Sequence, residues 1–329
     1  MPLHDLLALV MLLAVVAYGV LAGADFGGGV LDLLARGPRQ AAQREAIAHA
    51  MGPVWEANHV WLIFVIVLLF TGFPAAHEAL GRALFLPFHL VLAGIALRGA
   101  AFVFRSYGPQ EADALRRWGR VFGAASAVTP VLLGMCLGAV SSGDIRVVGS
   151  EVTGSGAWLR PVSVALGVFA LGLCTYVGAV FLTVETEGEL QEDFRRRALA
   201  VGTAVVVVSA AMVPFVAGQA PHLWAGLVSP RGMAALVPGV VAALASGWAL
   251  WQRRFRLARV ATVVQVGSVV AGWGLAQHPY VIYPDVTTAS AAAPRATLVF
   301  TLGSVPFGLA LLLPSLWLLF RVFKGRRAR

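Results

Sequence analysis

Residues 6–35 read LLALVMLLAVVAYGVLAGADFGGGVLDLLA, and this stretch decides the class of fold. Residues 6–22 carry no charge, and a run of about 17 to 25 apolar residues is what a helix needs to cross ~30 Å of hydrocarbon. We expect a membrane-spanning helix at 6–22, with a weaker extension to residue 35. No basic region or small-residue cleavage site precedes it, so we expect a retained span and not a signal peptide.

The composition of the whole chain indicates the same class. Of 329 residues, 59% are hydrophobic and 12% are charged, about half the charged share of roughly 25% that soluble domains carry. The mean hydropathy is +0.80. A soluble globule and a disordered chain are excluded. Further apolar segments of spanning length are predicted at 55–73, 84–104, 121–140, 162–184, 201–217, 233–251, 260–276 and 296–320, which makes nine helices in one all-α membrane domain.

The distribution of basic residues predicts the orientation of these helices. Alternate connections and the C-terminal tail hold 19 of the 25 Lys and Arg residues, the opposite connections hold 5, and Arg98 lies inside the third span. Basic residues near spans favour the cytoplasmic side, so we expect the N-terminus outside and the C-terminus in the cytoplasm. The net charge of +9 is thus a topology signal, and no nucleic-acid partner is expected.

Asp25 lies in a glycine-rich motif, GADFGGGVL, at residues 23–31. Charged groups are costly in lipid, so an acid here is a functional candidate by default. The glycines allow either close helix contact or a local break, and both turn Asp25 toward protein or water. Two interpretations stay open: a proton- or ion-handling group, and a structural partner for a neighbouring cation.

A second polar motif, GPVWEANHVWLI at residues 52–63, opens the second span. Its polar and aromatic members are Trp55, Glu56, Asn58, His59 and Trp61. Glu56 and His59 have the ExxH spacing of di-iron helices, but no second ExxH occurs in the chain, so a di-metal site is disfavoured. The two tryptophans alone would serve an aromatic belt at the membrane interface. We predict proton handling for the polar residues and structural roles for Trp55 and Trp61.

Arg98 lies about six residues from the inner end of its span, ~9 Å deep, which is far for a side chain to reach the interface. We expect it to pair with a carboxylate such as Asp25 or Glu56. The predicted topology places these three residues and Glu185 in the cytoplasmic half of the membrane. That shared depth indicates an entry for water and protons from the cytoplasm.

The sequence predicts no catalytic, haem-ligating or metal-ligating residue in this chain. His89 stands alone in the third span and is expected to be a hydrogen-bonded core residue. No two histidines lie at matched depth on facing spans, and no CxxC or Cys/His zinc spacing occurs. Cys136 and Cys174 differ in predicted depth by roughly 10 Å, so no disulfide is expected.

These motifs resemble a known family. The segments GADFGGGVL, GPVWEANHVWLI, ALRGAAFVFR (residues 96–105) and ETEGEL (residues 185–190) look like those of subunit II of cytochrome bd-type quinol oxidases. The resemblance is most specific over the first 105 residues, and the second half matches mainly in hydropathy. It implies a multi-pass subunit of the bacterial cytoplasmic membrane in the respiratory chain.

The resemblance implies a division into a four-helix bundle at 1–141, a second at 142–276, and a peripheral ninth helix with a basic tail at 277–329. It implies a heterodimer with a larger subunit I that holds haem b and haem d, or b-type variants, and the quinol site. Subunit II would stabilise the haem assembly and line a proton path, with Asp25 and Glu56 at the acidic positions of the motifs. A structural quinone, a small accessory subunit and contacts with quinol-pool lipids are left open.

Two other interpretations remain at this stage. A proton-coupled secondary transporter would have inverted repeats and a polar site at broken helices near the midplane. Only one glycine-rich polar segment, at residues 23–29, has that character, and it lies near one membrane face. A purely structural scaffold would tolerate removal of its acidic residues without loss of oxidase turnover.

Overall fold

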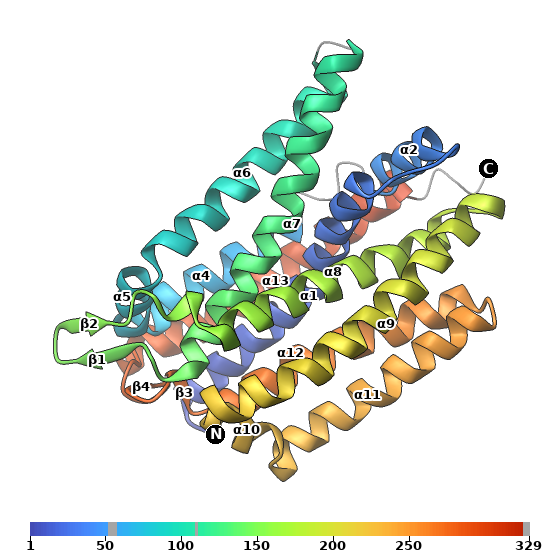
Figure 1. Ribbon diagram of the computed structural model, residues 1–329. Coiled ribbons are helices and arrows are strands. Elements are labelled where there is room, and N and C mark those ends of the chain that lie inside the picture. The colour runs from blue at the N-terminus through green and yellow to red at the C-terminus, as the bar shows by residue number, and fades with distance from the viewer. Residues whose placement is uncertain (52–57, 109–110, 325–329) are drawn as a thin grey trace.

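The computed structural model describes residues 1–51, 58–108 and 111–324, and these form a helical bundle with two small β-hairpins (Figure 1). The helices are α1 (Leu3–Leu33), α2 (Gln40–Met51), α4 (Val60–Gly72), α5 (Pro74–Ala83), α6 (Phe85–Tyr107), α7 (Ala112–Ser142), the 3₁₀ turn η2 (Ala157–Leu159), α8 (Pro161–Glu185), α9 (Gly188–Gln219), α10 (Pro221–Leu227), α11 (Pro230–Trp251), α12 (Phe255–Gln277) and α13 (Arg295–Lys324). The strands are β1 (Arg146–Val148), β2 (Glu151–Thr153), β3 (Tyr280–Ile282) and β4 (Val286–Thr287).

The prediction of a many-span helical membrane chain is confirmed. Eight helices among the described residues are long and apolar enough to cross a membrane, namely α1, α6, α7, α8, α9, α11, α12 and α13. The second predicted span, 55–73, contains α4, and α5 follows it after a bend of 117°. The two helices count as a ninth span only if taken together. Pro74 begins α5 and brings no N–H of its own. The Gly72 carbonyl at the bend accepts a hydrogen bond from the Ala293 amide at 2.8 Å.

The two hairpins are absent from the sequence prediction, which had only connections there. Strand β1 pairs antiparallel with β2, and β3 pairs antiparallel with β4. Asp285 joins the two hairpins, because it accepts hydrogen bonds from Arg146 Nε at 2.8 Å and from the Val147 amide at 2.8 Å. We call this the hairpin end of the bundle and the opposite one the α2 end. The start of α1 and the end of α13 lie at opposite ends (Figure 1).

Helix α1 is the central element of the bundle. It packs against α4, α7, α8 and α12, while α13 lies at the side against α1 and α4. Two main apolar clusters fill the interior. One, around Leu7, Phe73 and Ile282, lies toward the hairpin end, and the other, around Ile47, Phe194 and Leu250, lies toward the α2 end.

Candidate functional site

The glycine-rich motif lets α1 approach its neighbours at backbone distance. A Cβ atom added at Gly27 would lie 1.9 Å from the Cys174 carbonyl oxygen on α8. A Cβ atom at Gly29 would lie 2.1 Å from Ser126 Oγ on α7. Helix α1 runs without a break through this motif, so close helix contact, and not a local break, is what these glycines provide.

This close packing buries Asp25 beside the start of the second span. Asp25 is 8% exposed and Asn58 is 6% exposed. The Asn58 side-chain amide donates to Asp25 Oδ2 and, at 3.5 Å, to the Leu21 carbonyl. The structure therefore brings together two of the residues that the sequence predicted for proton handling.

Asp25 and Asn58 line a cavity of about 100 Å³ between α1, α2 and α8. Glu185, at the end of α8, lines the same cavity, and its side chain is 20% exposed. Glu185 Oε1 lies 3.8 Å from Arg259 Nη1 on α12. The cavity thus connects a buried acid with an acid that solvent reaches.

Arg98 is fully buried on α6, and its positive charge interacts with the negative charge of Asp25. Its Nε donates to Ser126 Oγ at 3.1 Å, and its guanidinium carbon lies 5.2 Å from the ring centres of both Phe26 and Phe122. Of the two carboxylates expected for Arg98, Asp25 is therefore in electrostatic reach. The aromatic faces add cation–π attraction to a buried cation.

His59 and Trp61 pack on the same part of α1. His59 Nδ1 is 3.4 Å from the Tyr18 hydroxyl, and its ring centre lies 5.9 Å from that of Phe26. Trp61 packs against the apolar cluster formed by Tyr18, Ala22 and Phe26. Both side chains therefore face protein at this position.

Glu56 and Trp55 lie outside the described residues, so their predicted roles stay predictions. The expectation for His89 is wrong in part. It is hydrogen bonded, with Nδ1 2.7 Å from the Phe85 carbonyl oxygen, but it lies on the exposed face of α6 and not in the core. A histidine that bonds its own helix needs no partner from the bundle interior, and for this reason a lone histidine in a span does not indicate burial.

Sequence reasoning missed a buried ion pair at the α2 end. Arg105 Nη1 lies 2.9 Å from Asp32 Oδ2, Nη2 lies 3.0 Å from Oδ1, and the Asp32 side chain is 2% exposed. In the sequence, Arg105 counts toward the topology and ends the segment ALRGAAFVFR, and no partner was predicted for it. The available signal was the spacing of Asp25 and Asp32, seven residues apart and so on one face of a helix. The contacts of Ser126 with Arg98 and of Tyr18 with His59 could not be predicted from the sequence, because single hydroxyl residues are common in membrane spans.

Within residues 1–51, 58–108 and 111–324, no group of three or more His, Cys, Asp or Glu side chains is arranged to hold a metal ion. Both cysteines are free thiols. The fold and the site define a multi-pass membrane chain that has buried acids on its central helix α1 and a buried arginine on the neighbouring helix α6.

The family follows from comparison with known proteins. The model of the family described as cytochrome bd terminal oxidase subunit II matches residues 3–323, and the chain belongs to this family. It is therefore a subunit of a bacterial inner-membrane quinol oxidase that works with a subunit I.

Individual relatives agree with this family. A protein of Bacillus subtilis (strain 168) assigned as a cytochrome bd menaquinol oxidase subunit II is 25% identical over 321 residues, which cover 93% of this chain and 91% of the relative. Cytochrome bd-I ubiquinol oxidase subunit 2 of Escherichia coli (strain K12) is 28% identical over 59% of this chain and 51% of the relative.

The fold is also that of a solved bd oxidase. A chain in the structure of bd oxidase from Geobacillus thermodenitrificans has a TM-score of 0.82 at 24% identity, with 98% of this chain and 99% of that chain covered. The family implies haems in the partner subunit. The secondary-transporter interpretation is not favoured.

Proposed function

We propose that this subunit provides a proton entry from the cytoplasm toward the oxygen-reducing haems of subunit I, and that it stabilises that haem assembly. The observation that carries the proposal is the cavity whose wall holds Asp25, Asn58 and Glu185 together. Reduction of oxygen to water consumes protons, and acids lining a cavity inside a membrane are the usual means of delivering them.

Each residue of the cavity has a distinct role in this proposal. Glu185, partly exposed and 3.8 Å from Arg259, takes up protons at the α2 end. Asp25 holds a proton inside the bundle, and Asn58 fixes the carboxyl orientation through its hydrogen bond. The buried charge of Arg98 offsets part of the cost of a negative Asp25. Glu56 and His59 complete the proposed route on the basis of the sequence motif.

We propose that the α2 end faces the cytoplasm and that the N-terminus lies outside. The support is the segregation of basic residues, 19 against 5, between alternate connections. In the same proposal, residues 1–141 and 142–276 act as two four-helix bundles, and residues 277–329 supply a peripheral helix and basic tail. Haem b and haem d, or b-type variants, and the quinol site are assigned to subunit I.

The experiment is quinol oxidase activity per haem in the complex that carries Asp25→Asn. Asparagine keeps the size and the hydrogen-bonding capacity of the side chain but cannot carry a proton. We expect a rate lowered by about a hundredfold, the lower end for loss of a proton-transfer group, with an unchanged haem spectrum. Glu187→Gln is the matched control, because Glu187 is exposed and does not line the cavity. Wild-type turnover in Asp25→Asn would support a purely structural scaffold instead.

A further inference from the structure

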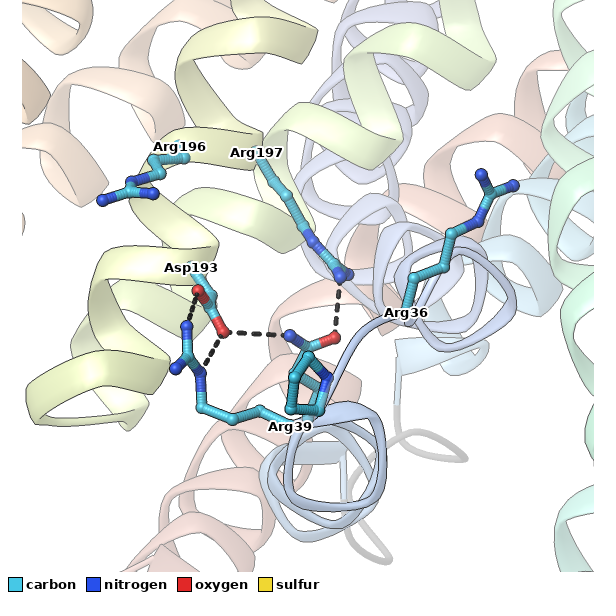
Figure 2. A pocket seen from close by; sticks show the side chains of 7 residues that line it. Arg36, Arg39, Asp193, Arg196 and Arg197 are labelled. Carbon is cyan, nitrogen blue, oxygen red and sulfur yellow. Dashed lines mark hydrogen bonds and ion pairs between the residues drawn. The ribbon is translucent and has the colours of Figure 1, made fainter.

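Two arginine-bearing segments that are far apart in the sequence meet at the α2 end. Arg36 and Arg39 follow α1, whereas Arg196 and Arg197 lie on α9. Together they form most of the wall of a pocket of about 250 Å³ (Figure 2). The remaining lining residues are Pro38, Gln43 and Asp193. In the sequence, these arginines belong to two separate connections and serve as topology signals. In the folded chain, they line one basic pocket.

The single acid that lines the pocket, Asp193, forms its ion pair with Arg39, and Arg39 Nη1 also lies 2.9 Å from Glu189 Oε2 outside the lining. Asp193 accepts from Arg39 Nε at 2.8 Å and from Arg39 Nη2 at 2.7 Å. Gln43 donates to the same carboxylate at 3.0 Å and accepts from Arg197 Nη2 at 2.6 Å. Figure 2 shows these contacts as one chain, with Arg196 and Arg36 on either side of it. Asp193 therefore neutralises Arg39 and orders Gln43.

Arg196 Nε lies 3.4 Å from Glu192 Oε1, so three acids pair with the arginines of the pocket. Positive charge is still left over, because the pocket has four arginines. The hydrogen-bond acceptors of Arg197 are the neutral Gln43 side chain and, at 3.4 Å, the Leu31 carbonyl. Arg36 makes no hydrogen bond or ion pair with any residue in the described ranges, and it is exposed. The charge of Arg197 is attracted by Asp193 and repelled by Arg36. A bound anion would relieve that repulsion, and an exposed arginine reorients freely enough to meet it.

We propose that this pocket binds the phosphate group of an anionic phospholipid. Guanidinium groups match phosphate oxygens in geometry, and basic pockets between spans at the membrane surface suit lipid headgroups. Exposed apolar side chains for the acyl chains lie close in sequence to the basic residues, because Leu33 and Leu34, 39% and 42% exposed, precede Arg36 by three and two positions. A free phosphate would gain nothing from these apolar side chains. This site is independent of the proposed proton route.

The test is lipid binding to the purified, delipidated complex, measured by native mass spectrometry. The probes are dioctanoyl phosphatidylglycerol, dioctanoyl phosphatidylcholine and inorganic phosphate. We expect phosphatidylglycerol to bind more tightly than the other two, and Arg36→Gln to weaken its binding about fivefold, the loss expected for one arginine near the membrane surface. Arg36→Lys should retain most of the affinity, because the charge remains.

Arg256→Gln is the matched control, since it removes an exposed arginine from the same end of the bundle outside the pocket. An equal loss in Arg36→Gln and Arg256→Gln would mean general surface charge and overturn the site. Phosphatidylcholine binding as tightly as phosphatidylglycerol would overturn the requirement for a net negative headgroup. Inorganic phosphate binding as tightly as phosphatidylglycerol, with the same dependence on Arg36, would replace the lipid by a small anion and overturn the proposal.

Discussion

Arg98 is the largest fully buried side chain among the described residues. Its charge is compensated by Asp25 and by two aromatic faces, so its removal leaves a buried carboxylate without its cation. We predict that Arg98→Leu costs about 3–5 kcal/mol of stability, as breaking a buried charge pair does. The measurement is the melting temperature and the yield of haem-loaded complex.

Arg98→Leu should lower the yield of assembled complex more than it lowers turnover per haem in the complex that does assemble. Arg117→Leu is the control, because it removes an exposed arginine from α7. Normal yield and stability combined with lost turnover would contradict a structural role for Arg98 and place it in the proton route itself.

The prediction for Glu56 rests on the sequence motif GPVWEANHVWLI alone, because Glu56 lies outside the described residues. Glu56→Gln keeps size and hydrogen bonding but cannot exchange a proton, so oxygen reduction should slow while the haem spectrum stays nearly unchanged. Glu56→Asp should be much milder, because the acid remains with a reach one methylene shorter. The check is quinol oxidase activity normalised to haem content. Equal rates in wild type and Glu56→Gln would remove Glu56 from the route.

At the scale of residues, the sequence singled out Asp25, Arg98 and Glu185 but missed the buried Asp32 and most of the side-chain contacts. Asp25, Arg98 and Glu185 could be found because ionisable groups in apolar segments are rare and costly. The pairing of Arg98 with Ser126, and of Asp32 with Arg105, depends on how far each helix is rotated toward its neighbour. That rotation is set by side-chain packing between helices, which a single sequence does not display.

At the scale of elements, the contact of α1 with α8 depends on Gly27. We predict that Gly27→Ala destabilises the complex by about 1–3 kcal/mol through overpacking, because the new Cβ would lie 1.9 Å from the Cys174 carbonyl oxygen. Thermal unfolding of the purified complex measures the effect. Gly119→Ala on α7 is the control, since no atom lies within 4 Å of the position of its added Cβ. Equal stability of the two variants would mean that α1 does not need backbone contact at this point.

The hairpin end should be sensitive to acid. Hydrogen bonds from Arg146 hold the pKa of Asp285 below its usual value, so this contact is fully formed above the unfolded pKa of about 3.9. It is lost as pH falls through the lower folded-state pKa. Because Arg146 is 51% exposed, solvent screening keeps the contribution of this contact small.

Hydrogen exchange of the Val147 amide reports this contact directly, because that amide donates to Asp285. Corrected for intrinsic exchange, its protection should be constant from about pH 5 to 8 and fall below about pH 4. In Asp285→Asn it should be lower and independent of pH over the same range. Protection in the wild type that does not change with pH would contradict the role of the Asp285 charge.

The spans themselves could be predicted because spanning length and hydropathy are local properties. Helices such as α9 and α12 extend beyond the predicted apolar segments, since polar residues can continue a helix outside the membrane. The bend between α4 and α5 and the two hairpins were not predicted. They depend on contacts over long sequence distances, such as Ala293 with Gly72 and Arg146 with Asp285.

At the scale of the whole molecule, two acids that were predicted at a similar membrane depth lie at the same cavity in the folded chain. Asp25 and Glu185 are 160 positions apart in the sequence, yet they line one cavity because α1 and α8 pack at glycine contacts. In the same way, Arg36 and Arg39 after α1 line one pocket with Arg196 and Arg197 of α9. Helix order could be predicted, whereas this lateral arrangement depends on packing.

The most direct test of a proton route through this subunit is proton uptake in a single turnover. The reduced complex is mixed with oxygen, and a pH-indicator dye and the haem absorbance are followed together. In Asp25→Asn, proton uptake should be slowed while oxygen binding to the haem proceeds at the wild-type rate, and Glu187→Gln should match the wild type in both. Proton uptake in Asp25→Asn at the wild-type rate would contradict the proposed route.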